Sequence, residues 1–467
     1  MDALLLARIQ FASTTLFHFI FVPLSIGLAL LIAIMQTLYV YKKKEIYWKM
    51  TKFWMTFFLI NFAIGAVTGI FQEFQFGMNW STYSRFVGDI FGAPLAFEAL
   101  LAFFLEATFI GVWMFGRDKL PKKLHLASIW LVSIGTMMSA FWIMAANSFM
   151  HNPVGFVLEN GRAEMNDFLA VLLNEKLWVA FPHTLFGSIA TGAFFVIGVS
   201  AWYLIRKKEI DIFQRSMNLA LVVGFVAGLA IAFTGHAQAT YLMHAQPMKM
   251  AAAEGLWEDS GDPAAWTLVA NIDVENKEST GRIDVPYLLS YLAYGKFEGK
   301  VDGMNTLQEK YTAEYGEGNY IPPVKTTFWS FRIMAGTGGV LMMLSGLGLF
   351  LSFRKKLLGN TKYLTVMVFA IALPFIGNSF GWIMSEIGRQ PWVVNGLMKT
   401  ADAVSPNVSA GKVLTSLISF SAVYVILGAT MAYLFVRVIK QGPQEKVKED
   451  VKATDPFATG EVQHGIK

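Results

Sequence analysis

The stretch that decides the fold is residues 11–40, FASTTLFHFIFVPLSIGLALLIAIMQTLYV, which contains no Asp, Glu, Lys or Arg. About 20 apolar residues in a helix cover the hydrocarbon of a bilayer, so this stretch is long enough to cross a membrane. It carries His18 and Pro23 inside its apolar run and is too long for a cleavable signal peptide. We therefore predict a transmembrane helix of the mature protein.

The same pattern recurs along the rest of the chain. The sequence of 467 residues is 55% hydrophobic and only 15% charged. Apolar blocks of spanning length lie at about 11–40, 53–77, 92–116, 125–147, 180–206, 215–240, 326–353, 361–386 and 409–437. These blocks predict an all-α integral membrane protein with nine transmembrane helices in bundles.

Lys and Arg residues set the predicted orientation. They gather in four short connections, with five at 42–52 and four each at 117–124, 206–215 and 354–362. By the positive-inside rule these connections face the cytoplasm, which places the N-terminus outside and the C-terminus inside. The formal net charge of +5 follows from this bias, so we expect a lipid membrane around the chain and no nucleic-acid partner.

The predicted organisation has four parts. Residues 1–240 hold helices 1–6, and residues 326–440 hold helices 7–9. Between them, residues 241–325 form a mostly polar extracytoplasmic segment that is too long for a simple turn. Residues 441–467 form a polar cytoplasmic tail without periodicity, which predicts disorder.

The chain contains no cysteine, which excludes disulfides, iron–sulfur clusters and covalent heme attachment through Cys-x-x-Cys-His. Redox chemistry would need His, Met or carboxylate ligands. The predicted topology brings such residues to the outer layer of the membrane from five helices, namely His18, Glu98, His183, Met334 and Glu386. Buried carboxylates in membranes usually bind a ligand, carry protons or pair with a cation. This clustering predicts a functional site.

Two classes of function fit this layer. In a transporter, the polar residues would line a substrate or proton path. In a heme protein, His and Met on neighbouring helices would supply axial ligands. Taken singly, each residue also has an ordinary interpretation, because a lone His often bridges two helices and Met334 is one of 23 methionines.

Several other polar residues have weaker assignments. Arg332 and Arg389 at the outer boundary could pair with the carboxylates or hold heme propionates. His125, His151 and His464 are interpreted as structural or solvated, with His151 in an outer loop. The roles of His236 and His244 stay open.

Four segments carry a family resemblance: RIQFASTTLFHFIFVPLSIG at 8–27, GDIFGAPLAFEALLAFFLEATF at 88–109, FRIMAG at 331–336 and GRQPW at 388–392. The chain resembles subunit I of the cytochrome bd-type quinol oxidases over nearly its whole length. The resemblance implies a terminal respiratory oxidase of the bacterial cell membrane that oxidises quinol, menaquinol or ubiquinol, and reduces dioxygen to water. It also implies low-spin heme b, high-spin heme b, heme d, a second membrane subunit (subunit II) in a heterodimer, and in some members a small single-helix subunit.

The resemblance assigns roles to individual residues. His183 and Met334 match the ligands of low-spin heme b, supported by Arg332. His18 and Glu386 match the iron ligands of high-spin heme b and heme d, without deciding which heme each one holds. The remaining matches are Glu98 and Glu106 for the oxygen site and its protons, Trp382 for electron passage between hemes, Arg389 for heme propionates, and Lys249 and Glu254 for quinol oxidation.

The mechanism that the resemblance implies separates charge across the membrane. Quinol protons would leave outside while protons for water come from the cytoplasm through Glu106, so a gradient forms without a pump. Glu106 lies about 12 Å deeper than Glu98 and about 80° around the helix axis, so we expect a water or second carrier to bridge them. The alternatives are an electron-transfer cytochrome that does not reduce oxygen, or a transporter. Without the resemblance, Lys249 and Glu254 would be interpreted as solvated loop charges.

Overall fold

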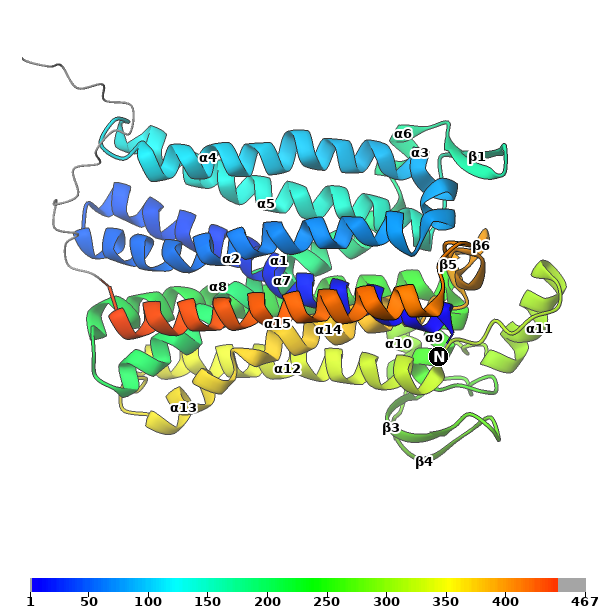
Figure 1. Cartoon of the computed structure of the whole chain (residues 1–467). Coiled ribbons are helices and arrows are strands. Elements are labelled where there is room, and N and C mark those ends of the chain that lie inside the picture. Colours follow the sequence, from blue (N-terminus) through cyan, green and yellow to red (C-terminus); the bar gives the residue numbers. More distant parts are fainter. Residues whose placement is uncertain (1, 444–467) are drawn as a thin grey trace, which may run out of the picture.

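The structure is a computed structural model that describes residues 2–443. Within these residues, nine helical segments are long and apolar enough to cross a membrane. Figure 1 shows them side by side along one direction, which confirms the predicted all-α membrane fold with nine spanning segments. Most of the predicted tail, 444–467, lies outside the described residues.

The spanning segments follow the apolar blocks closely. They are α1 (Ala3–Lys42), α2 (Glu45–Met78), α3 (Ser81–Phe97) continued by a π-helix (Glu98–Phe103) and α4 (Phe104–Phe115), α5 (Lys122–His151), α6 (Phe168–Leu172) with α7 (Glu175–Ile205), α8 (Ile210–Ala245), α12 (Val324–Phe353), α13 (Thr361–Phe369) with α14 (Ala372–Ile387), and α15 (Ala410–Gln441). The break between α13 and α14 has a local cause. Pro374 lacks a backbone N–H, and in a continuous helix its ring would clash with the carbonyl four residues earlier, at Ala370, which directly follows the end of α13.

Two glycines let α1 and α7 touch through their backbones. A Cβ atom at Gly27 would lie 2.5 Å from the Ser188 carbonyl oxygen, and a Cβ at Gly192 would lie 2.4 Å from the Gly27 carbonyl carbon. No side chain fits at either position. Large buried aromatic residues, among them Trp54 and Phe194, fill the interior around this crossing. The crossing therefore brings the first and fifth spanning segments into direct contact.

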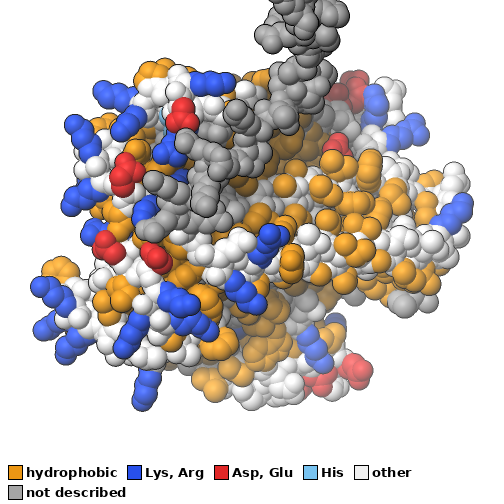
Figure 2. Space-filling view, turned by 60° about the vertical axis from the view of Figure 1, so that its left-hand side comes forward, with side chains coloured by type: hydrophobic (Ala, Val, Ile, Leu, Met, Phe, Trp, Pro, Cys, Tyr) orange, Lys and Arg blue, Asp and Glu red, His pale blue; other side chains and the backbone are white. Residues whose placement is uncertain are grey.

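The two ends of the bundle differ. One end carries the longer connections (Figure 1). These hold β1 (Phe156–Glu159), β2 (Arg162–Met165), α9 (Pro247–Glu254), β3 (Trp266–Asp273), β4 (Glu278–Val285), α10 (Leu288–Tyr294), α11 (Met304–Tyr315), β5 (Trp392–Val394) and β6 (Met398–Lys399). The other end has short connections, and Figure 2 shows Lys and Arg side chains gathered there. It is the end predicted to face the cytoplasm.

The segment between α8 and α12 has a hydrophobic core of its own. Met248 on α9, Trp257, Met304 on α11 and Tyr320 pack together with Phe328 on α12. The segment therefore packs as a folded cap on the bundle, although its composition is polar.

Candidate functional site

His18 lies on α1 and faces α2. Its Nδ1 atom is 2.9 Å from Oγ1 of Thr68, and that hydroxyl donates its one hydrogen to the Gly65 carbonyl at 2.9 Å. The imidazole Nδ1–H must therefore be the donor, which leaves Nε2 with a free lone pair. The ring also covers Gly69, where a Cβ would lie 3.4 Å from Cε1. His18 is thus held in the tautomer that binds iron through Nε2.

His183 repeats this arrangement on α7 and α8. Its Nδ1 atom is 3.2 Å from Oγ1 of Thr234, and this hydroxyl donates to the Ala230 carbonyl at 2.7 Å. A Cβ at Gly235 would lie 3.2 Å from Cε1 of the imidazole. Each histidine therefore lies against a Thr-Gly pair on the next spanning helix and keeps Nε2 free. Sequence reasoning missed this pair, although VTGI and FTGH are visible in the sequence.

Met334 lies on α12, and its thioether faces α14. A Cβ at Gly381 would lie 2.9 Å from Sδ. α12 also packs on α8, where a Cβ at Gly228 would lie 3.3 Å from Cβ of Met342. His183 and Met334 therefore come from two helices that both pack on α8 and on α14. A His and a Met form an axial pair typical of an electron-transfer heme, so these donors fit such a group.

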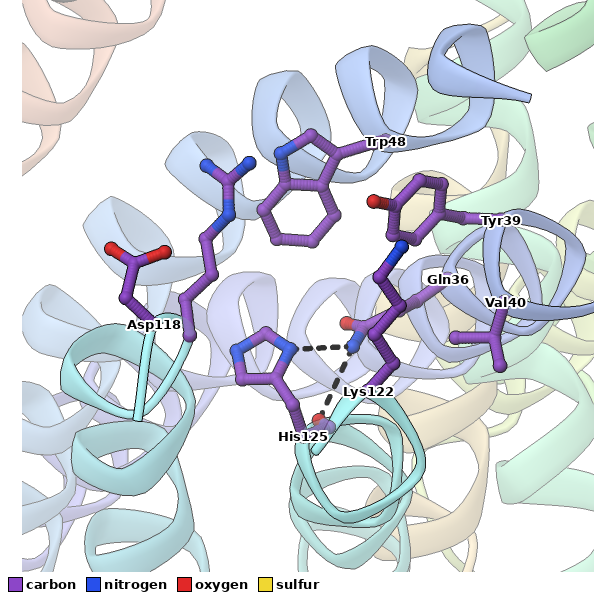
Figure 3. Close-up of a pocket in the computed structure, with 8 residues that line it drawn as sticks. Gln36, Tyr39, Val40, Trp48, Asp118, Lys122 and His125 are labelled. Carbon is purple, nitrogen blue, oxygen red and sulfur yellow. Dashed lines mark hydrogen bonds between the residues drawn. The ribbon is translucent and has the colours of Figure 1, made fainter. Parts of the chain in front are cut away.

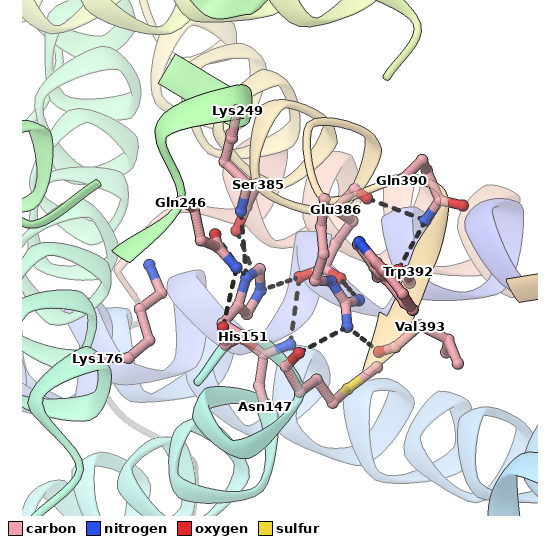
Figure 4. Close-up of polar contacts among 12 residues, drawn as sticks. Asn147, His151, Lys176, Gln246, Lys249, Ser385, Glu386, Gln390, Trp392 and Val393 are labelled. Atoms are coloured by element: carbon pink, nitrogen blue, oxygen red, sulfur yellow. Dashed lines mark hydrogen bonds and ion pairs between the residues drawn. The ribbon is translucent and has the colours of Figure 1, made fainter. Parts of the chain in front are cut away.

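Glu386 ends α14 inside a polar cluster (Figure 4). Its side chain is 13% exposed. Oε1 lies 3.1 Å from Nε2 of His151 and accepts a hydrogen bond from Asn147 at 3.2 Å, while Oε2 forms an ion pair with Arg389. Arg389 also donates to the Val393 carbonyl. The predicted Arg389 partner is thus in place, and two neighbours from α5 join it.

His151, predicted as a structural or solvated residue of an outer loop, lies in a helix instead. α5 continues to His151 and ends directly before Asn152 and Pro153. The His151 side chain is buried. Its Nδ1 atom lies 3.1 Å from Nζ of Lys249 on α9. Burial, with some help from nearby Lys176, holds the pKa of Lys249 well below its usual range. His151 therefore stands between the outer segment and Glu386.

Glu254, at the end of α9, is also buried. Its Oε2 forms a 2.7 Å ion pair with Arg332 on α12, and its Oε1 accepts from Nε1 of Trp266 at 3.2 Å. Arg332 donates further to the Thr267 carbonyl at 3.0 Å. Burial raises the pKa of Glu254, while the Arg332 charge opposes this rise. The solvated interpretation is wrong for both loop charges, since Lys249 is 2% and Glu254 is 1% exposed.

Glu98 and Glu106 face the same helix. Glu98 accepts a 2.7 Å hydrogen bond from Ser139, and a Cβ at Gly135, one turn earlier on α5, would lie 2.7 Å from Cγ of Glu106. The expectation of about 80° assumed an α-helix throughout, whereas the intervening residues form a π-helix, which turns less per residue and so reduces the separation. Oε1 of Glu106 is buried and has no hydrogen-bond partner within residues 2–443.

The structure places four further residues around this end. Trp382 is half-buried on α14, one turn before Glu386. Lys176, missed by sequence reasoning, is buried in the first turn of α7 and donates to Gln238 at 3.3 Å. His236 stacks on Tyr291 of α10 with ring centroids 5.4 Å apart, and His244 is exposed.

These residues place His, Met and carboxylate side chains, whose donor atoms can bind iron, beside a buried carboxylate pair and a folded outer segment. A family profile described as cytochrome bd terminal oxidase subunit I matches residues 6–443. The chain belongs to this family. The predicted recognition is therefore confirmed, and the chain is a subunit of a quinol:oxygen oxidoreductase in a bacterial membrane, with heme cofactors.

Known proteins are similar over nearly the whole chain. Cytochrome bd ubiquinol oxidase subunit 1 of Bacillus subtilis strain 168 is 62% identical, with 100% of both chains covered. Cytochrome bd-II ubiquinol oxidase subunit 1 of Escherichia coli K12 is 36% identical, covering 96% of this chain and 98% of that protein. The solved bd oxidase from Geobacillus thermodenitrificans superposes with a TM-score of 0.87 at 30% identity, covering 95% and 99% of the two chains. The transporter alternative is not favoured.

Proposed function

We propose that His183 and Met334 hold low-spin heme b, and that His18 and Glu386 hold the irons of high-spin heme b and heme d. The hydrogen bonding of the two histidines carries this proposal, because each has its Nδ1–H committed to a threonine and its Nε2 free. Bound hemes supply one-electron carriers and the iron at which dioxygen is reduced. Arg389 orients the Glu386 carboxylate for its role as a ligand.

We assign quinol oxidation to the folded outer segment. Glu254 is the proton acceptor, since burial raises its pKa and so favours its taking up a proton that quinol releases. Arg332 holds Glu254 in place and lies two residues before Met334, so the base sits close to the proposed electron acceptor. Lys249, which is also on α9, links this segment to the Glu386 cluster through its contact with His151. The Bacillus subtilis relative is named for ubiquinol.

Glu98 and Glu106 are assigned to the protons that water formation consumes. Both face α5, and the unpartnered oxygen of Glu106 is free to accept or donate a proton. Glu106 lies nearer the end with short connections, which is predicted to face the cytoplasm. Quinol protons released at the opposite end then create a gradient by charge separation, without a pump.

Subunit II is the proposed partner, in a heterodimer that a small single-helix subunit can join. Three spanning segments have few buried positions in their apolar stretches within this chain: 17% in Ser81–Phe115, 17% in Thr361–Ile387 and 6% in Ala410–Gln441. Their outer faces are available to lipid or to neighbouring membrane helices.

The test separates quinol oxidation from oxygen reduction. Lys249→Ala and Glu254→Ala should each slow oxygen uptake driven by quinol by about 100-fold, the usual size of a lost proton-transfer group. The same variants, reduced chemically, should react with oxygen at the parent rate. Equal slowing of both routes would show that the outer segment does not house the quinol site.

The control is Lys310→Gln, which removes a charge from α11 of the same segment. Lys310 pairs with Asp302 at 2.6 Å on the surface, with 58% of the lysine side chain exposed. This variant should keep both rates. A loss of quinol-driven activity in the control would mean that any charge change in the segment impairs turnover.

A further inference from the structure

A cavity lies at the opposite end of the bundle from the proposed hemes. It has a volume of about 190 Å³ and is lined by α1, the start of α2, the connection between α4 and α5, and the start of α5 (Figure 3). Lys and Arg side chains are gathered at this end (Figure 2). None of the residues assigned to heme, quinol or proton transfer lines the cavity.

The floor of the cavity is a closed hydrogen-bond network. Gln36 accepts from Nε1 of Trp113 at 2.6 Å, and its amide nitrogen donates to Nδ1 of His125 at 2.9 Å. Nε2 of His125 then carries the proton and donates to the Trp113 carbonyl at 2.8 Å. The floor therefore has its polar groups satisfied and is rigid, with a neutral His125.

The walls, in contrast, carry donors without acceptors. Trp48 is 4% exposed, yet its Nε1–H has no hydrogen-bond partner among the described residues. The Arg117 guanidinium lies 4.4 Å from the centre of the Trp48 ring, and the Lys122 ammonium lies 5.3 Å from the centre of the Tyr39 ring. Neither cation forms an ion pair with residues 2–443.

These groups define the chemistry of a ligand. An indole N–H, a guanidinium and an ammonium are all donors, and together they match an anion with several acceptor oxygens. A buried donor left unpaired is costly, so an oxygen of such an anion would satisfy Trp48. The one acidic group in the wall, Asp118, would accept hydrogen bonds from hydroxyl groups of a ligand and would repel a bare anion.

We propose that this cavity binds the headgroup of an anionic phospholipid. Its phosphodiester would contact Arg117, Lys122 and Nε1 of Trp48, and hydroxyl groups such as those of a glycerol headgroup would contact Asp118. The location fits, because the cavity lies where spanning helices end and where amphipathic Trp and Tyr side chains meet headgroups. The ligand comes from the leaflet next to the Lys- and Arg-rich end.

The test is lipid binding to the complete, delipidated oxidase complex. Phosphatidylglycerol is titrated into the detergent-solubilised complex and bound lipid is counted by native mass spectrometry. The double variant Arg117→Gln/Lys122→Gln should bind its tightest phosphatidylglycerol at least about tenfold more weakly, the factor expected for losing one charged hydrogen bond. The matched control, Lys208→Gln/Lys356→Gln, removes two exposed cations from the same end and should bind like the parent. Equal affinity in the two double variants would overturn the proposal.

Two further measurements keep the result decisive. Trp48→Phe retains the ring and removes only the N–H, so it should weaken binding even if the double variant fails to assemble. Inorganic phosphate should not displace phosphatidylglycerol at equal concentration. Displacement of that kind, or binding of phosphate alone, would mean that the site takes soluble phosphate and would overturn the lipid assignment. Heme absorption and oxygen uptake should stay at the parent level, so failure here is separate from failure of the proposed oxidase roles.

Discussion

The buried ion pair between Arg332 and Glu254 ties the outer segment to α12. The two side chains are 6% and 1% exposed, and their charged atoms are 2.7 Å apart. Breaking a buried pair by neutralising one partner costs about 3–5 kcal/mol. Glu254→Gln keeps the side-chain volume and an acceptor for Trp266, so we expect the lower limit, about 3 kcal/mol. The free energy that holds α9 closed should fall by this amount.

Amide hydrogen exchange measures this loss directly. With local opening easier by about 3 kcal/mol, the backbone amides of α9 should exchange about 150-fold faster in Glu254→Gln than in the parent complex. Lys310→Gln is the control, since it breaks the exposed pair with Asp302. An exposed pair contributes at most about 1 kcal/mol, so exchange in α9 should change less than about fivefold. Similar exchange in the two variants would refute the idea that this pair holds the segment down.

Three other substitutions test single residues. Met334→Leu should remove the absorption of the low-spin heme, because Leu has similar bulk but no sulfur, and an unchanged reduced spectrum would contradict the ligand assignment. Lys249→Met should raise the thermal unfolding midpoint while slowing quinol oxidation. The pKa of Lys249 in the folded protein lies below its unfolded value of about 10.4. The parent protein therefore loses stability as pH falls from about 10.4 to the folded pKa. The stabilising effect of Met should grow toward acidic pH for this reason. Glu106→Gln should slow oxygen reduction about 100-fold with an unchanged heme spectrum, and a parent-like rate would remove Glu106 from the proton path.

Much of the fold could be predicted because a bilayer imposes a simple rule on sequence. Apolar length alone located the nine spanning segments. The interruption between α13 and α14 could have been found too, since Pro374 marks it. The π-helix at Glu98–Phe103, which packs on α5, was not predicted, because the residue types of EALLAF are those of an ordinary α-helix.

The site was only partly predictable, because several of its contacts join residues that are far apart in the sequence. Topology gave the depth of His18 and His183, but their tautomers depend on Thr68 and Thr234, which are far away in sequence. His151 was misplaced because the apolar block ends before the helix does, although Pro153 indicates where the helix must stop. The ion pair of Glu254 with Arg332 joins a polar loop to a helix, and no local pattern reports such a contact.

The crossing of α1 and α7 fixes the relative depth of two proposed iron ligands. His18 precedes Gly27 by nine residues, and His183 precedes Gly192 by the same number, so each lies about 13.5 Å from the crossing. As the first and fifth spanning segments, both helices run in the same direction. Inserting one residue into either interval would shift that ligand by about 1.5 Å along the membrane normal and by about 100° around its helix. The depth of the two proposed iron ligands is therefore set by two equal residue counts from one shared crossing.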